Sequence, residues 1–380
     1  MRLAIIHRAR PALALAGVIA AAFLLVGCGG APVSGWASAR VANGSVYFGS
    51  VTGKMFDVNA ADGSVKWEFP PDKTIAPLYS TPATAGTSLY FGAFDKNLYA
   101  LEAATGKVIW QFAAGDAIVP GPAVTNGVVY FGANDKKVYA VDAAQGKKMW
   151  EYTTNGEIWA DPTVADGVLY AASLDHNLYA LDATTGSKLW SFDAGGIVVT
   201  KPAVANGIVY IAGLSKLFAI DIKAATAAAA QDKAVPAKWT FSFGDESWIW
   251  SNPTVADGIV YFGSLEGDVT AVDASTGASK WPQPFKAGGS VRSAVIIDNG
   301  IAYFGSDDHK LYALDATTGT EKWAYNTGNQ IMASPAAADG VVYIPSLDRL
   351  LYAINEADGK PKWTLDTSTG KLVTPTPATQ

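Results

Sequence analysis

The sequence contains few of the residues from which catalytic and metal sites are usually built. It has one cysteine, Cys28, so no internal disulfide can form, and three histidines, His7, His176 and His309. His176 and His309 lie in separate turns and cannot alone supply a three-ligand metal site, so we interpret them as solvated. No Gly-x-Ser-x-Gly, phosphate-binding loop or His-Glu-x-x-His motif is present. These absences argue against a bound metal ion and against the common classes of hydrolase.

Basic residues are also sparse and form no run. The chain has 28 Lys and Arg against 34 Asp and Glu, a net charge of −6. Cleavage of the N-terminal segment would remove Arg2, Arg8 and Arg10 and take the net charge to about −9. An acidic chain without a basic patch is a poor binder of nucleic acid, so no nucleic-acid partner is expected.

A long apolar run without charge occurs at the N-terminus, from Ala12 to Val26, and ends at Leu25-Val26-Gly27-Cys28. This pattern resembles the bacterial lipobox, in which the cysteine is lipidated and becomes the mature N-terminus. We therefore expect residues 1–27 to be a signal peptide and residues 28–35 to be the lipidated Cys28 and a short tether. Plain secretory cleavage and a retained anchor are the alternatives, although about 15–17 apolar residues are marginal for a membrane span.

The anchor predicts an exported protein held at the cell envelope through the lipid on Cys28. In a cell with two membranes this would be the periplasmic face of the outer membrane, and otherwise the outer face of the cytoplasmic membrane. Seven tether residues reach at most ~25 Å. The folded part should therefore lie close to its membrane.

The remaining sequence is built from repeats of a segment such as Leu178-Tyr-Ala-Leu-Asp-Ala-Thr-Thr-Gly-Ser-Lys-Leu-Trp190. Near-copies recur about every 40 residues. They end in eight tryptophans, Trp67, Trp110, Trp150, Trp190, Trp239, Trp281, Trp323 and Trp363. A period near 40 sustained over the chain is typical of a repeat architecture.

Each repeat predicts four short antiparallel strands. Upstream of the segment lies a pair such as Asp166-Gly167 or Asn126-Gly127, which favours a type I′ hairpin because both residues tolerate positive φ. A polar turn and a Thr-Gly turn separate the later strands. The pattern predicts an all-β, eight-bladed β-propeller over residues 36–380. An α-solenoid is the alternative, but strand alternation and paired turns argue against it.

Two segments depart from the repeat. Residues 222–238 replace a Thr-Gly turn with Ala-rich sequence, which favours a short helix stopped by Pro236. We interpret it as a surface insertion, with a partner-contact loop as the alternative. The tail, residues 370–379, resembles the segment 328–337 and predicts a ninth first strand that pairs beside the first blade and helps to close the ring. A frayed end is the alternative.

The repeated Ala-x-Asp-Ala-x-Thr-Gly-x-x-x-Trp resembles the tryptophan-docking motif of pyrroloquinoline-quinone (PQQ) dehydrogenase propellers. The resemblance implies that each Trp packs between blades and that residues such as Asp142, Asp182, Asp273 and Asp315 shape turns and are not catalytic. Enzymes of that family also use Ca²⁺, a catalytic Asp and often an adjacent Cys pair. This sequence has no Cys pair and no long active-site insertion. A quinoprotein dehydrogenase is therefore the third hypothesis.

The whole layout resembles the BamB family, the lipoproteins of the outer-membrane β-barrel assembly machinery. That resemblance implies a non-catalytic scaffold without a cofactor, acting as a monomer within a complex and binding an envelope protein partner. This is the leading hypothesis. A ligand-binding or sensing propeller that uses its channel mouth is the second.

Aligning the repeats on the proline of their first strand predicts the residues of that mouth. One equivalent position in each blade is occupied by Ser38, Thr81, Gly121, Asp161, Lys201, Asn252, Ser293 and Ser334. Arg292 is expected one residue away, and Trp36, Tyr79, Trp159 and Trp250 two residues upstream. The possible binding residues are thus Trp159, Asp161, Lys201, Trp250, Asn252 and Arg292, because polar groups ringed by aromatics suit a ligand pocket. A water-filled channel with aromatics packed on the blade tops is the alternative.

Overall fold

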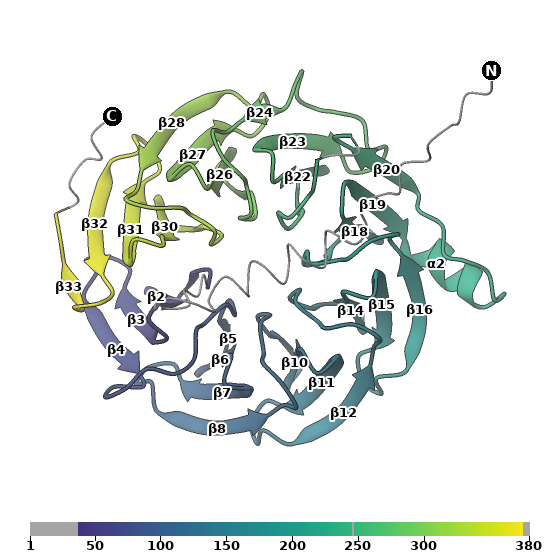
Figure 1. The fold of residues 1–380 in the computed structure, drawn as a ribbon, viewed down its shortest axis with the longest axis horizontal. Helices are drawn as coiled ribbons and strands as arrows, with labels where there is room; N and C mark the ends of the chain where they lie inside the picture. The colour runs from purple at the N-terminus through teal and green to yellow at the C-terminus, as the bar shows by residue number, and fades with distance from the viewer. Residues whose placement is uncertain (1–36, 245–246, 375–380) are drawn as a thin grey trace, which may run out of the picture. The chain divides into compact units, whose positions relative to one another are not determined.

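The computed structural model describes residues 37–244 and 247–374, which form eight sheets arranged in a ring (Figure 1). Each sheet has four consecutive antiparallel strands, and the last sheet has a fifth. The prediction of an all-β, eight-bladed propeller is confirmed. The predicted signal peptide, Cys28, the predicted tether and Trp36 lie outside the described residues.

Blades 1 to 4 follow the repeat closely, and their first strands are only three residues long. Their strands are β1 (Arg40–Ala42), β2 (Ser45–Gly49), β3 (Met55–Asn59), β4 (Val65–Phe69), β5 (Ala83–Ala85), β6 (Ser88–Gly92), β7 (Asn97–Glu102), β8 (Val108–Ala113), β9 (Ala123–Thr125), β10 (Val128–Gly132), β11 (Lys137–Asp142), β12 (Lys148–Thr153), β13 (Thr163–Ala165), β14 (Val168–Ala172), β15 (Asn177–Asp182) and β16 (Lys188–Asp193).

Blades 5 to 8 carry the one helix that the described residues contain and a strand beyond the repeat. Their elements are β17 (Ala203–Ala205), β18 (Ile208–Gly213), β19 (Lys216–Asp221), α2 (Ile222–Ala229), β20 (Trp239–Ser242), β21 (Thr254–Ala256), β22 (Ile259–Gly263), β23 (Asp268–Asp273), β24 (Phe285–Lys286), β25 (Ile296–Asp298), β26 (Ile301–Gly305), β27 (Lys310–Asp315), β28 (Glu321–Asn326), β29 (Ala336–Ala338), β30 (Val341–Pro345), β31 (Leu350–Asn355), β32 (Pro361–Asp366) and β33 (Lys371–Leu372).

The hairpin between the first two strands of a blade has the predicted backbone. Asp166 and Gly167 have φ of 50° and 77°, and Asn126 and Gly127 have 50° and 75°. A type I′ turn requires positive φ at both central residues, which Asn or Asp followed by Gly adopts with little strain. The turn sets the register in which Ala165 pairs with Val168.

The core lies between blades. The two middle strands of each blade are almost entirely buried, and eight apolar clusters each join neighbouring blades. The cluster of Val46, Phe48, Phe56, Tyr343 and Trp363 joins blade 1 to blade 8 and closes the ring. A blade has two apolar faces, and closure leaves neither face uncovered.

The insertion forms the predicted helix. Asp221 caps α2 by accepting a hydrogen bond from the Ala224 N–H. The helix ends at Ala229, before Pro236, so another turn and not the proline ends it. Its buried Ala225 belongs to the cluster that contains Trp190. None of the helices in the described ranges is long and apolar enough to cross a membrane.

The described part of the tail forms an outer strand of blade 8, which the sequence did not predict. Lys371 and Leu372 form β33, which pairs with Asp366 and Leu365 of β32 on the outer edge of blade 8. It is thus an outer strand and not a first strand beside blade 1. The Leu372 side chain still approaches Gly63 of blade 1. Residues 375–380, which align with the first strand of blade 8, lie outside the described ranges, so the predicted ninth first strand stays a prediction.

Candidate functional site

Residues at the start of each first strand converge on the ring axis, where the sequence predicted a mouth. Two adjoining depressions lie there, one of about 110 Å³ and a shallower one of about 400 Å³. Both are lined by Ser38, Thr81, Asp161, Asn252 and Ser334. Lys201 lines only the shallower depression. Residues from most of the blades therefore meet at this mouth.

These residues are joined from blade to blade by backbone-to-side-chain hydrogen bonds. The Gly121 N–H donates to Asp161 Oδ1 at 2.6 Å, and the Lys201 N–H donates to Asn252 Oδ1 at 2.7 Å. Ser334 accepts from the Ala294 N–H and donates its own N–H to Ser38 Oγ, both at 2.8 Å. Short polar side chains at this position thus satisfy backbone donors of the preceding blade, which gives the polar circle a structural role.

The predicted position of Ser293 is wrong by one residue. Ala294 occupies the circle in blade 7, whereas Ser293 is buried and exchanges hydrogen bonds with the backbone of Gly305 at 2.9 Å. Thr200 does the same with Ala212 in blade 5. Blade 7 has no proline at its first strand, so the alignment on proline was shifted by one residue there.

Arg292 consequently lies two residues upstream of the circle, at the level of the aromatic residues. The described residues at this second level are Tyr79, Val119, Trp159, Val199, Trp250, Arg292 and Met332, and all line the 110 Å³ cavity. Six of these seven residues are apolar or aromatic, and the seventh, Arg292, carries the guanidinium. The predicted aromatic crowding is present, with a single cation inside it.

Contacts on both sides hold the Arg292 side chain in place. Its Nε donates to Asp307 Oδ2 at 3.1 Å, and its guanidinium lies 5.9 Å from the centre of the Trp250 ring. Burial raises the pKa of the Asp307 carboxyl, although the charge and hydrogen bond of Arg292 oppose that shift. Asp307 Oδ1 is buried without a hydrogen-bond partner. An unsatisfied buried oxygen is costly, so a ligand or water that donates to it would be stabilised there.

Asp161 and Lys201 come from adjacent blades, and the sequence suggests that they could pair, but among the described residues they form no ion pair with each other. Burial raises the pKa of the Asp161 carboxyl, while the Lys201 charge and the Gly121 N–H oppose the shift. The Lys201 side chain is exposed. Trp159 is oriented by its indole N–H, which donates to Glu157 Oε2 at 2.8 Å.

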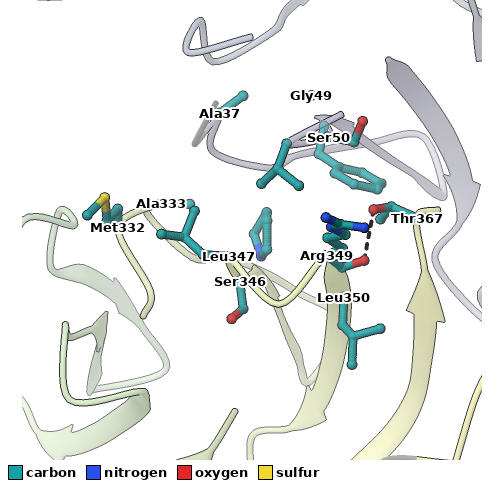
Figure 2. A pocket seen from close by; sticks show the side chains of 13 residues that line it. Ala37, Gly49, Ser50, Met332, Ala333, Ser346, Leu347, Arg349, Leu350 and Thr367 are labelled. Atoms are coloured by element: carbon teal, nitrogen blue, oxygen red, sulfur yellow. Dashed lines mark hydrogen bonds between the residues drawn. The ribbon is translucent and has the colours of Figure 1, made fainter. Parts of the chain in front are cut away.

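A second cavity lies at the seam of blades 8 and 1, beside Ala37, Ser50, Leu347 and Arg349 (Figure 2). The Thr367 hydroxyl donates to the Arg349 carbonyl at 2.8 Å there. Its volume is about 10 Å³, which holds at most a single water molecule. The mouth is therefore the better candidate for a binding site.

The repeat tryptophans lie between blades. Trp190, Trp281 and Trp363 are buried, and Trp67, Trp110, Trp150, Trp239 and Trp323 are half-buried. Seven donate the indole N–H to a backbone carbonyl of the next blade, as Trp150 does to Ala183 at 3.1 Å. Trp190 instead packs beside α2, which starts where the other blades have that carbonyl.

The turn aspartates have the local role that the docking motif implies. Asp182 Oδ1 accepts from the N–H groups of Thr184 and Thr185, which lowers the pKa of the carboxyl. Asp142, Asp273 and Asp315 make equivalent bonds. His176 and His309 lie in turns of separate blades with φ of 78° and 72°. Within residues 37–244 and 247–374, no three His, Cys, Asp or Glu side chains are grouped to hold a metal.

A recurring tie between blades was missed at the level of sequence. Asp175 accepts from the Tyr179 hydroxyl and from the Asn155 N–H, both at 2.8 Å, and so joins its blade to the loop that enters it. The same pairing occurs at Asp135, Asp308 and Asp348. Asp followed four residues later by Tyr is the sequence signal that could have revealed it.

The sequence matches the family described as outer membrane protein assembly factor BamB over residues 29–117, 94–264, 232–333 and 265–380. A search of the curated proteins finds no match.

Solved structures share the fold at low identity. A computationally designed protein, Ika8, has a TM-score of 0.70 and 16% identity over 87% of this chain and 95% of its own. BamB from Moraxella catarrhalis has a TM-score of 0.65 and 17% identity over 84% of this chain and 93% of its own. The quinohemoprotein alcohol dehydrogenase ADHIIG from Pseudomonas putida HK5 has a TM-score of 0.62 and 16% identity over 85% of this chain and 70% of its own. At these identities the likeness concerns the propeller fold alone.

Proposed function

Because the chain belongs to the family of the outer membrane protein assembly factor BamB, we propose that it is a non-catalytic scaffold of the cell envelope that binds a protein partner through its channel mouth. The partner is a component of outer-membrane β-barrel assembly, and the chain is held at the membrane by lipid on Cys28. Family membership supports the assembly role, and the geometry of the mouth supports the binding surface.

The observation that carries the binding surface is the convergence of Tyr79, Trp159, Trp250 and Arg292 on one cavity. Aromatic side chains and arginine dominate binding energy at protein interfaces, because they bury a large area and donate directed hydrogen bonds. The circle of Asp161, Asn252 and the serines holds the loops that carry them. A rigid platform lowers the entropy that association would otherwise cost.

The test is the double variant Trp159→Ala, Trp250→Ala in the full chain, with Trp248→Ala as the control. Trp248 lies in the same loop as Trp250 but does not line the mouth. We expect the wild type and the control to co-purify with the central β-barrel assembly protein from the native envelope, and the double variant to lose it. Retention of that protein by a correctly folded double variant would exclude the mouth.

A sensing function is the second candidate, favoured by the Arg292 guanidinium among the aromatic and apolar side chains that line the 110 Å³ cavity. A concave site that combines apolar side chains with a few polar groups is typical of a small-ligand pocket. A quinoprotein dehydrogenase remains the third hypothesis, because one of the structurally similar proteins is an alcohol dehydrogenase.

A further inference from the structure

Two carboxylates lie close together at the seam of blades 7 and 8. Asp298 ends β25 of blade 7, at the end of that strand away from the mouth, and Glu356 follows β31 of blade 8. The Asn299 Nδ2 atom donates to Asp298 Oδ2 at 3.0 Å and to Glu356 Oε2 at 3.3 Å, so both carboxylates contact the same nitrogen. Among the described residues, neither carboxylate forms an ion pair with a lysine or arginine. We call Asp298 and Glu356 the seam acids.

The seam acids occupy positions that are uncharged in every other blade. The position of Glu356 is Ile222 in blade 5 and alanine in the remaining six blades, at Ala60, Ala103, Ala143, Ala183, Ala274 and Ala316. The position of Asp298 is Thr125 in blade 3 and alanine in the remaining six, at Ala42, Ala85, Ala165, Ala205, Ala256 and Ala338. Two separate departures from the repeat therefore meet across one seam.

Two buried polar atoms at this seam have no hydrogen-bond partner. Tyr303 is 0% exposed and its hydroxyl is unpaired, and Glu356 Oε1 is also buried without a partner. In six other blades the equivalent tyrosine donates to the carbonyl of the alanine at the Glu356 position, as Tyr261 does to Ala316 at 3.2 Å. Because unpaired buried polar groups are costly, this seam needs another interaction in place of the missing hydrogen bond.

Burial and the neighbouring acid both act on the protonation of Glu356. Burial raises the pKa of its carboxyl, and the adjacent Asp298 carboxyl raises it further, while the hydrogen bond from Asn299 opposes the shift. Burial, followed by the charges of both seam acids, also raises the pKa of the Tyr303 hydroxyl, so that hydroxyl lies near both carboxylates. Two carboxylates at one site repel each other when both are ionised, so the pair favours retention of one proton.

The other charged groups around the seam acids do not neutralise them. Lys322 of β28 and Lys360, in the turn after β31, each pair with an aspartate of their own turn. Lys362 of β32 is exposed and has no ion pair in the part of the chain that the structure describes. The blade 8 hairpin that accepts the N–H of Glu356 carries a third acid, Asp339. A proton is therefore the positive charge that these surroundings favour between the two carboxylates.

We propose that Asp298 and Glu356 share one proton in the folded protein, and that this proton holds the seam of blades 7 and 8 closed. The shared proton replaces repulsion between two carboxylates with a hydrogen bond. Its loss at higher pH leaves two negative charges beside the Glu356 carbonyl, to which the Trp323 indole N–H donates at 2.9 Å. The seam therefore loosens as the pH rises and tightens as it falls. The mouth takes no part, so this inference goes beyond the proposed function and does not depend on it.

The first test measures the protonation of Glu356 by NMR of the full chain, labelled with carbon-13 at the glutamate carboxyls. Loss of one signal in Glu356→Gln assigns it. Asp298→Asn should lower the pKa of Glu356, because an amide carries no charge and donates a hydrogen bond to the carboxylate. Asp339→Asn removes a nearby carboxylate outside the pair and should leave the pKa of Glu356 unchanged. An unchanged pKa in Asp298→Asn would overturn the proposal, because burial alone would then account for the shift.

The second test measures opening of the seam by hydrogen exchange at the indole N–H of Trp323. Trp110 is the internal reference, because it is also half-buried and donates to the carbonyl of Ala143, an alanine at the Glu356 position, at 3.0 Å. Base catalysis accelerates both exchange reactions alike, so the ratio of the two rates reports the seam alone.

In the wild type the ratio of the Trp323 rate to the Trp110 rate should rise at least about threefold from about pH 4 to about pH 8, because the raised pKa of Glu356 means that the stabilising proton is lost over this range. The ratio should stay constant in the double variant Asp298→Ala, Glu356→Ala, which carries the residue that six other blades have at each position. A constant ratio in the wild type, or an equal rise in the double variant, would each overturn the proposal.

Discussion

The indole N–H of Trp363 in blade 8 donates to the backbone carbonyl of Ala60 in blade 1 at 3.1 Å. The Tyr343 hydroxyl donates to the same carbonyl at 3.0 Å. These contacts span almost the whole chain, and they close the ring with the docking geometry that the other blades use along it. Closure therefore depends on the repeat itself and not on an exchanged strand.

This relationship predicts graded losses of stability at Trp363. Trp363→Phe keeps an aromatic ring but removes the hydrogen bond, and should lower the free energy of unfolding by about 1 kcal/mol. Trp363→Ala also empties the space between blades 8 and 1 and should cost about 3–5 kcal/mol. Urea unfolding measures both. Equal, small effects of the two substitutions would contradict a closed seam.

Gly63 offers a second test of the seam. Its φ is 76°, and a Cβ there would lie 2.7 Å from both Trp363 Cδ2 and Leu372 Cδ2. Gly63→Ala should therefore destabilise the protein by at least about 1 kcal/mol, because it adds left-handed strain to a steric clash. The matched control is Gly167→Ala, where φ is 77° but no atom lies within 4 Å of the added Cβ. A cost at Gly63 no larger than at Gly167 would show that the seam is loose.

Trp190 tests the docking role at a blade where the motif is modified. It is 2% exposed, its ring centre lies 5.8 Å from that of Tyr170, and it shares a cluster with Ala225 of α2. Trp190→Ala should cost about 3–5 kcal/mol in urea unfolding. Trp67 is only half-buried, so Trp67→Ala should cost less. A loss below about 1 kcal/mol at Trp190 would refute the packing between blades.

The repeat made the fold predictable in detail, because turns and strands are local features. The pair Asp166-Gly167 specifies its hairpin through backbone conformation alone, and the tryptophan spacing specifies the number of blades. The helix in the insertion was also predictable, since Ala-rich sequence after Asp221 favours a capped helix. The pairing of Leu372 with β32 was not, because the free outer edge of blade 8 that accepts it is a feature of the folded ring and not of the local sequence.

The site was predictable only as far as the alignment held. Asp161 and Asn252 meet at the mouth as expected, whereas the absence of a proline displaced Ser293 by one residue. The contact of Arg292 with Asp307 joins two loops of blade 7 whose approach depends on strand twist, so no sequence pattern shows it.

The anchor remains a prediction, because Cys28 lies outside the described residues. Cys28→Ala should prevent lipidation and shift the chain from the membrane fraction to the soluble fraction, since one or two acyl chains would supply the membrane affinity. Cell fractionation with immunoblotting measures the distribution, and mass spectrometry of the N-terminal peptide measures the modification. Cys28→Ser is the matched variant and should behave alike. Unchanged partition and size of both variants would exclude the lipoprotein hypothesis.

The ties between blades predict a dependence of stability on pH. Burial raises the pKa of the Asp175 carboxyl, but hydrogen bonds from Tyr179, Asn155 and Asn177 outweigh burial and hold the pKa below its ordinary value. Because the folded-state pKa lies below the unfolded one, the contribution of Asp175 is present above about pH 4 and is lost as pH falls further.

Asp175→Asn should therefore lower the free energy of unfolding by about 1–2 kcal/mol at pH 7, because a neutral amide accepts these hydrogen bonds more weakly than a carboxylate. The difference from wild type should shrink as pH falls below about 4, where the wild-type carboxylate also becomes neutral. Asp166→Asn is the control in the same blade, because asparagine already occupies the equivalent hairpin position at Asn126 and Asn206. It should leave the free energy of unfolding unchanged at pH 7. A difference between Asp175→Asn and wild type that stays constant from pH 7 to pH 3 would show that the carboxylate charge does not contribute to the tie.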